Sequence, residues 1–249
     1  MLALERTVAK AHARSPRFQR AVDEANRLIE EGLKRMESPA IAFSGGKDST
    51  VVLDLVRRQN PAVVAHFGHE QWLLPETEQF VGQVDNLIKS ALPDNHAEWF
   101  SVWDNPDDVP DDVMYIDKNK YTEFDYGRKM MGWDGVFLGL RAEENAYRKI
   151  FLRKLGPMRY CKKHDMWECN PIAWWKVEDV WAYIVSRDIQ YNRAYDKLAE
   201  LGLPIQHRRI GPMAQQRVLE HGQMVILRRG WPEVFERFAA AHPEAWGYV

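Results

Sequence analysis

The nine residues Ala42 to Thr50, with the sequence AFSGGKDST, constrain the fold of this chain more than any other segment. An apolar run that includes Ile41 and Phe43 stops at Ser44, and a second apolar run with helical spacing begins at Val51. This pattern predicts a strand, a tight glycine loop and the N-terminus of a helix. The two glycines allow positive φ angles and leave the neighbouring backbone N–H groups accessible.

A loop of this kind predicts an anion site. The helix that follows contributes free backbone amides and the positive end of its dipole, and phosphate is the anion most often bound there. The alternative is an ordinary strand-to-helix turn with Asp48 or Ser49 as the N-cap. We favour the anion site because a serine precedes the glycines and Lys-Asp and Ser-Thr follow them. The loop is not of the Walker type, because Ile41 stands where that loop needs glycine, and Lys47 and Ser49 exclude the G-x-G-x-x-G dinucleotide loop.

Apolar runs and helical spacings alternate along much of the chain. After an amphipathic helix at residues 15–36, we expect strands and helices at the following positions: strands at 40–43, 62–67, 99–103 and 134–140, and helices at 48–59 and 75–91. This order is typical of an α/β fold with a doubly wound, mainly parallel sheet, in which ligands bind beyond the carboxyl ends of the strands. The remaining patterns predict a C-terminal helical appendage packed on the sheet: an extended piece at 171–175 and helices at 176–187, 213–230 and 231–240.

The composition is that of a globular protein without a membrane span. The chain has 249 residues, of which 45% are hydrophobic and 28% charged, and its net charge is −2. Nucleic acid would therefore need a local basic patch, since the chain as a whole is not basic. No apolar run approaches the roughly 20 residues that cross a bilayer, and the charged N-terminal segment is unlike a secretory signal. Two cysteines form no disulfide framework. We expect a reducing, cytoplasmic setting.

Three further segments each allow more than one interpretation. Asp104–Asp117 holds six aspartates and two prolines, which predicts a surface loop or lid, with a metal site as the alternative. The basic segment Lys149–Lys163 is either a patch for an anionic substrate such as a nucleic-acid backbone or a solvated loop. Cys161, His164 and Cys169 lie within nine residues and allow three interpretations. They could begin a zinc site, carry redox or sulfur chemistry, or pack in the core.

Two arginines follow the fourth predicted strand, at residues 134–140. The segment from Arg141 to Arg148 is expected to start a helix. Arg141 comes directly after the strand and Arg148 two helical turns later. The guanidinium fork of arginine pairs well with phosphate or sulfate oxygens, so both side chains are candidates for the anion site. The alternative is that the side chains of Arg141 and Arg148 are solvated, or form ion pairs with the neighbouring Glu143 and Glu144.

The segment SGGKDST at residues 44–50 matches the SGGxDS signature of the PP-loop ATPases, whose loop grips the phosphates of an adenine nucleotide. From about residue 38 to 212 the chain resembles the phosphoadenylyl-sulfate reductase-like branch of that superfamily. The resemblance is carried by four segments: the loop itself, Leu74-Pro75-Glu76-Thr77, the GxRxxES-like element from Gly139 to Arg148, and the segment Pro171–Asp196 with its Asp179-Val180-Trp181 core. It implies a nucleotide-binding α/β domain at 38–170, between an N-terminal helix at 1–37 and a helical region at 171–249.

The sequence departs from the pattern of that branch at three places. His69-Glu70-Gln71 stands where the branch usually has Asp-Thr-Gly, and Asn145 replaces the serine of the GxRxxES element. The reductases of the branch attack sulfur with a cysteine near the C-terminus, whereas no cysteine follows Cys169 in this chain. The cysteine pairs that hold an iron–sulfur cluster in some relatives are missing too. The resemblance therefore carries over the fold and the nucleotide site, but not the reductase chemistry.

What the resemblance implies is a PP-loop enzyme that uses ATP, forming AMP and pyrophosphate, to activate an acceptor. ATP or another adenine nucleotide would contact a set of residues in and near the loop: Ser44, Gly45, Gly46, Lys47, Asp48, Ser49, Thr50, Gly139 and Arg141. Catalysis would rest on Lys47, Asp48, Arg141 and Arg148, with Asp48 as a candidate ligand of Mg²⁺.

Several points stay open at this stage. The acceptor is a nucleic acid or a protein, and the chain acts as a homodimer or with a partner subunit. One alternative is a sulfonucleotide reductase that uses Cys161 or Cys169. Another is a nucleotide-binding subunit of a larger assembly that catalyses nothing itself.

Overall fold

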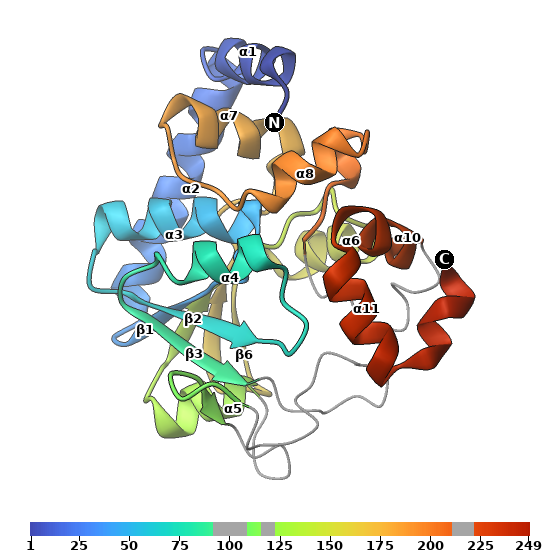
Figure 1. The fold of residues 1–249 in the computed structure, drawn as a ribbon. Helices are drawn as coiled ribbons and strands as arrows, with labels where there is room; N and C mark the ends of the chain where they lie inside the picture. The colour runs from blue at the N-terminus through green and yellow to red at the C-terminus, as the bar shows by residue number, and fades with distance from the viewer. Residues whose placement is uncertain (92–108, 116–122, 211–221) are drawn as a thin grey trace. The chain divides into compact units, whose positions relative to one another are not determined.

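The computed structural model describes residues 1–91, 109–115, 123–210 and 222–249 (Figure 1). Seven strands form one sheet: β1 (Pro39–Ala42), β2 (Val64–His69), β3 (Leu87–Ala91), β4 (Met114–Tyr115), β5 (Gly135–Phe137), β6 (Met158–Cys161) and β7 (Met166–Cys169). Their order is β4-β3-β2-β1-β5-β7-β6. Strand β1 pairs in parallel with β2 and β5, β5 with β7, and β3 with β4, whereas β6 and β7 form an antiparallel hairpin. The predicted α/β fold with a mainly parallel sheet is confirmed.

The chain divides into two compact units. The first comprises Met1–Phe67, Asp85–Ile88 and Glu123–Tyr191. Its helices are α1 (Ala3–His12), α2 (Pro16–Arg35), α3 (Lys47–Gln59), α5 (Glu123–Met130), α6 (Ala146–Leu155) and α7 (Val177–Ser186). The second comprises Gly68–Val84, Lys89–Thr122 and Asn192–Val249. Its helical elements are α4 (Pro75–Val81), α8 (Ala194–Glu200), η2 (Ile205–His207), α10 (Gln223–Gly230), α11 (Pro232–Ala241) and η3 (Pro243–Tyr248).

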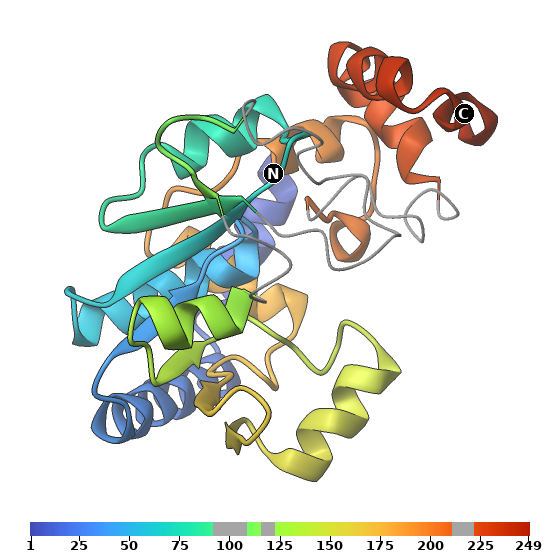
Figure 2. The same ribbon diagram turned by 90° about the horizontal axis from the view of Figure 1, so that it is seen from below.

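Helices cover both faces of the sheet in the first unit. Consecutive strand residues point to opposite faces, and in β5 Val136 packs with Trp133 and Ala40, while Phe137 lies against α2. There α2 approaches so closely that a Cβ on Gly32 would lie 2.8 Å from the Phe137 ring. Helix α5 crosses the Trp133 face, and in Figure 2 it lies in front of the strands, on the side away from α3.

The amphipathic helix predicted at 15–36 is present as α2. Ser15 caps it by accepting the N–H of Phe18 at 3.2 Å, and Pro16 occupies its first turn, where a missing N–H does no harm. Its buried residues recur at steps of three and four. A further helix, α1, precedes it and packs on α7. His12 of α1 lies 2.7 Å from the Asp179 carboxylate of α7, which also accepts from Arg17.

The predicted helix at 75–91 is wrong in its second half. Helix α4 ends at Val81, and residues 87–91 form strand β3. Gly82 follows the helix, and Asn86 adopts a left-handed φ of 47°, so the helical path is broken before the apolar residues at 87, 88 and 91. The predicted strand at 99–103 lies outside the described residues.

Two other predictions are revised. Within the acidic segment 104–117, Met114–Tyr115 forms strand β4, and Asp112 pairs with Lys89 at 2.5 Å; residues 104–108 and 116–117 lie outside the described part. The extended piece predicted at 171–175 is largely a turn, which occupies residues 171–174.

The C-terminal helices of the second unit are present where expected. Helix α10 covers the last part of the predicted 213–230 helix, whose beginning lies outside the described residues, and α11 matches the predicted helix at 231–240. They form a small apolar core with Trp72, whose ring meets Phe238 edge-on at 5.7 Å. None of the helices in the described ranges is long and apolar enough to cross a membrane.

Candidate functional site

The predicted strand, glycine loop and helix start are confirmed at residues 39–59. Strand β1 ends at Ala42, Gly45 adopts a φ of 69°, and Gly46 is the N-cap of α3. Hydroxyl groups fasten the loop to the first turn of the helix. Ser49 Oγ accepts the N–H of Ser44 at 3.1 Å and donates to the Gly46 carbonyl at 3.0 Å, to which Thr50 Oγ1 also donates at 2.8 Å. The loop is therefore held in one shape before any ligand arrives.

This arrangement brings a helix N-terminus to the carboxyl end of a central strand. The first N–H groups of any helix lack partners within that helix, and in α3 they belong to the turn that begins at Lys47. Together with the helix dipole they favour an anion in front of the loop. Ser44 is exposed at this point and Gly45 is buried.

A cluster of three buried charged groups lies directly behind the loop. One carboxylate oxygen of Asp48 accepts from Lys47 Nζ at 2.8 Å, and the other accepts from Arg141 Nε at 2.6 Å. The side chains of Lys47 and Arg141 are only 6% and 5% exposed. Burial opposes ionisation of Asp48, but the charges of Lys47 and Arg141 outweigh it and lower the pKa of Asp48 below its ordinary value. Asp48 is therefore ionised and holds both cations in this cluster.

Arg141 owes its position to a close backbone approach beside it. A Cβ on Gly139 would lie 3.0 Å from both the carbonyl carbon of Asp48 and the backbone nitrogen of Ser49. Only glycine lets the segment after β5 pass this close to the first turn of α3. Gly139 thus packs against the loop, and its backbone carries Arg141 to Asp48.

Arg141 also connects the loop with the start of α7. Its Nη1 donates to Glu143 Oε2 at 2.7 Å and lies 3.4 Å from the carbonyl oxygen of Trp175. The same oxygen of Glu143 accepts the N–H of Val177, the first residue of α7, at 2.7 Å. The pairing of Arg141 with Glu143 is the alternative that the sequence left open, whereas the bond of Glu143 to α7 was not predicted.

Arg148 lies elsewhere than the loop cluster, on the first turn of α6. Its side chain pairs with Glu144, which also accepts the backbone N–H of Arg141 at 3.2 Å. Asn145, which differs from the family pattern, is the N-cap of α6 and accepts the N–H of Arg148 at 2.7 Å. The structure thus joins Lys47, Asp48 and Arg141 and pairs Arg148 with Glu144. The Asn145 cap was readable from the sequence, since asparagine is a preferred N-cap.

The two cysteines occupy opposite ends of the β6–β7 hairpin. Cys161 pairs with Met166 and Cys169 with Met158, so the two thiols are separated by about 10 Å along the strands. Both are buried and free, and burial raises the pKa of the Cys169 thiol to about 12. In the described part of the chain, no group of three His, Cys, Asp or Glu side chains could hold a metal ion. Of the roles considered for these thiols, packing fits the structure.

The residues that replace Asp-Thr-Gly lie at the end of β2 and directly after it. Burial raises the pKa of Glu70 to about 8. His69 is also buried, and this burial, with the charge of Lys89, lowers its pKa. This segment of the second unit therefore carries two titratable groups that stay neutral at neutral pH.

The carboxylate of Asp48 is a poor fit for Mg²⁺. Magnesium bound by a protein usually takes one or two carboxylates together with phosphate oxygens. Both oxygens of Asp48 are already bonded to cations, and a dication placed there would lie beside Lys47 and Arg141.

Comparison with known proteins identifies a family for this chain. Residues 38–217 match the model of a family described as "Phosphoadenosine phosphosulfate reductase domain". A phosphoadenosine 5'-phosphosulfate reductase of Gloeobacter violaceus is 36% identical over 168 residues, which cover 63% of this chain and 65% of that protein. The chain thus spans slightly less than two thirds of this relative.

Two solved structures show the same fold at low identity. An FMN adenylyltransferase of Candida glabrata, solved with FMN and the ATP analog AMPCPP, has a TM-score of 0.51 at 14% identity and covers 77% of this chain and 66% of its own. A phosphoadenylyl-sulfate reductase of Candida auris, solved with phosphate, has a TM-score of 0.51 at 17% identity and covers 76% and 88%. The resemblance inferred from the loop and the later motifs is confirmed.

Proposed function

The chain belongs to the phosphoadenosine phosphosulfate reductase domain family, and from this membership we propose that it is an enzyme that binds ATP at the loop Ser44–Thr50 and activates an acceptor by adenylyl transfer. The family contains enzymes, and the proteins that share its fold include one solved with an ATP analog. The products would be AMP, carried by the acceptor until a nucleophile attacks, and pyrophosphate. A cytoplasmic setting is part of the same proposal.

The observation that carries this proposal is the cluster of Lys47, Asp48 and Arg141 at the N-terminus of α3, next to the glycine loop. Phosphoryl and adenylyl transfer rest on positioning and on charge stabilisation, with little other chemistry for the protein to supply. Amides in front of α3 would contact the phosphate oxygens, and Lys47 and Arg141 would offset charge that develops on the departing pyrophosphate. Before ATP binds, Asp48 would hold the side chains of Lys47 and Arg141 in place.

The state of the thiols favours adenylyl transfer over sulfonucleotide reduction. A reductase of this family needs a thiolate that reaches the substrate. Cys161 and Cys169 are both buried, and a thiol with a pKa of about 12 holds very little thiolate at neutral pH. Reduction remains the second candidate because relatives such as the Gloeobacter violaceus protein are named reductases.

The test uses the purified chain with ATP in magnesium-containing buffer. Calorimetry would measure ATP affinity, and an enzyme-coupled assay would measure pyrophosphate release with protein and nucleic-acid acceptors. Lys47→Met keeps most of the side-chain length but removes the charge, and we expect about tenfold weaker binding from the loss of one charge-assisted contact. Lys10→Met, at an exposed position on α1, is the matched control.

Three outcomes separate the candidates. Pyrophosphate release that depends on Lys47 supports adenylyl transfer. ATP binding without turnover on any acceptor supports a nucleotide-binding subunit. Sulfite release from phosphoadenylyl sulfate with a thiol donor supports a reductase and contradicts the proposal, as would equal ATP affinity of Lys47→Met and the wild type.

A further inference from the structure

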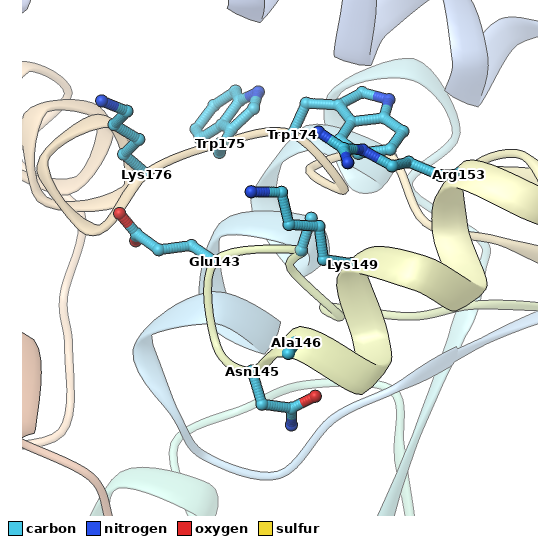
Figure 3. A pocket seen from close by; sticks show the side chains of 9 residues that line it. Glu143, Asn145, Ala146, Lys149, Arg153, Trp174, Trp175 and Lys176 are labelled. Atoms are coloured by element: carbon cyan, nitrogen blue, oxygen red, sulfur yellow. The ribbon is translucent and has the colours of Figure 1, made fainter.

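A pocket of about 520 Å³ opens between the first turns of α6 and the turn that leads into α7. Its lining includes Glu143, Lys149 and Arg153 on one side and Trp174 and Lys176 on the other. Figure 3 shows Lys149 and Arg153 extending from α6 toward Trp174, while Asn145 points away. We propose that this pocket binds single-stranded nucleic acid, with a base stacked on Trp174 and phosphates on the three cations. This inference rests on the proposed function and names its acceptor class.

The charges that line the pocket are positive and available. Lys149, Arg153 and Lys176 are exposed, and none of them forms an ion pair with another described residue. The carboxylate of Glu143 does not compensate them, because it is bonded to Arg141 and to the N–H of Val177. An anion that enters the pocket therefore meets three cations that form no ion pair within the described part of the chain.

Trp174 provides an exposed aromatic face at the same place. Its side chain is 43% exposed, whereas its neighbour Trp175 is 3% exposed and packs against Phe18 and Tyr183 in the core. Trp175 therefore fills the structural role, and the Trp174 ring stays open to solvent beside Lys149 and Arg153. Aromatic faces set among cations are how proteins bind single strands, because every unpaired base can stack on them.

A polymer fits the distribution of charge better than a free phosphate. Lys149 and Arg153 are one helical turn apart, which is about 6 Å along α6, and Lys154, the next residue of the same helix, is exposed as well. Arg159, in the strand that follows, does not add to these charges, since it pairs with Glu168 at 2.5 Å. The net charge of the whole chain is −2, so this is a local basic surface on a protein that is not basic overall.

Glu143 connects the pocket with the loop cluster. Glu143 lines the pocket and bonds to Arg141, which in turn bonds to Asp48 behind the loop. A strand held at Trp174 would thus lie next to the residues proposed to contact ATP, as an acceptor must. A duplex would not fill this role, because its bases are paired and stacked on each other and offer no free face to Trp174.

The experiment measures fluorescence anisotropy of a short labelled single-stranded oligonucleotide with the full chain, in the absence of ATP and at several salt concentrations. For three phosphate contacts the slope of log affinity against log salt should be about −2, and Lys149→Ala with Arg153→Ala should reduce its magnitude by about 1.4. Trp174→Ala should weaken binding about tenfold with the slope unchanged, and Trp174→Phe should restore most of the loss. Lys10→Ala, on α1, is the charge control.

Several results would overturn the proposal: wild-type affinity in both the Trp174→Ala and the double-cation variants, equal affinity for a duplex of the same length, or displacement of the oligonucleotide by AMP or inorganic phosphate at matching concentration. Thermal melting would verify that each variant is folded. If the oligonucleotide fails to bind while ATP binds normally, this inference falls and the proposed function stands. The reverse result would leave a nucleic-acid site in a chain that lacks the proposed function.

Discussion

Gly139→Ala tests directly whether the backbone contact behind the loop shapes the site. The added Cβ would lie 3.0 Å from two backbone atoms, the carbonyl carbon of Asp48 and the nitrogen of Ser49. Ordinary contacts between such atoms are about 3.5–4.0 Å, so the first turn of α3 or the segment that carries Arg141 must move by roughly 0.5 Å. Because both sides of the contact are backbone, no side chain can swing away to relieve it.

The expected loss follows from two opposing terms. Overpacking of this kind costs about 1–3 kcal/mol, and replacing glycine by alanine returns about 0.4–1 kcal/mol by restricting the unfolded chain. We expect a net loss of about 1–2 kcal/mol, which for a chain of this size lowers Tm by roughly 2–8 °C. Calorimetry should also show weaker ATP binding, because the shift displaces Asp48 or Arg141 from their 2.6 Å contact.

The control is Gly247→Ala, where an added Cβ meets nothing within 4 Å. We expect it to melt and bind ATP like the wild type. If Gly139→Ala melts at the wild-type temperature and binds ATP with unchanged affinity, the close approach has no part in building the site and the reasoning fails.

Four further expectations follow from charge and burial. Arg141→Gln leaves the Asp48 carboxylate with one of its two cations, so urea unfolding at neutral pH should show a loss of about 3 kcal/mol that shrinks in acid as Asp48 is protonated; an equal loss at both pH values would contradict this. The pKa of Asp48 is lowered in the folded chain, so its stabilisation is complete above the unfolded value of 3.8 and is lost as the pH falls through the folded value; thermal melts of Asp48→Asn should show a flatter acid limb than the wild type. The pKa of Glu70 is raised to about 8, so the wild type should lose stability as the pH rises from 4.5 to about 8, with no further loss at higher pH. The Glu70→Gln variant should therefore melt at a higher temperature than the wild type at about pH 9, and the difference in Tm should be smallest near pH 4.5. A difference in Tm that is the same at both pH values would count against a buried carboxyl. Cys161→Ala combined with Cys169→Ala should leave ATP-dependent pyrophosphate release unchanged, since both thiols are buried, whereas loss of activity with retained folding would point to thiol chemistry.

The elements that the sequence predicted well are those with strong local signals. The Ser15-Pro16 start and regular apolar steps of α2, and the glycine pair between β1 and α3, are set by neighbours in sequence. The predictions failed where a short apolar run fits two structures. Residues 87–91 continue the helical spacing of residues 80 and 84, but the helix ends before Gly82 and the left-handed backbone at Asn86 precedes a strand.

The candidate site was predictable as a set of residue types but not as a set of contacts. SGGKDST and the Arg141 segment mark the loop and a nearby cation. No spacing rule, however, states that Asp48 bonds both to Lys47 beside it and to Arg141, which is 93 positions away. The bond from Glu143 to the first N–H of α7 was not predicted either, and nothing in the sequence tells which of Trp174 and Trp175 is buried.

The bonds from Asp48 through Arg141 to Glu143 imply a thermodynamic linkage between two ligands. A phosphate that displaces Arg141 from Asp48 must also change the bond between Arg141 and Glu143. Glu143 in turn lines the pocket and accepts the first N–H of α7. If filling the loop alters the affinity of the pocket by some factor, filling the pocket alters the affinity of the loop by the same factor. One arginine would thus make each ligand an effector of the other, which would couple the proposed ATP site to the proposed acceptor site.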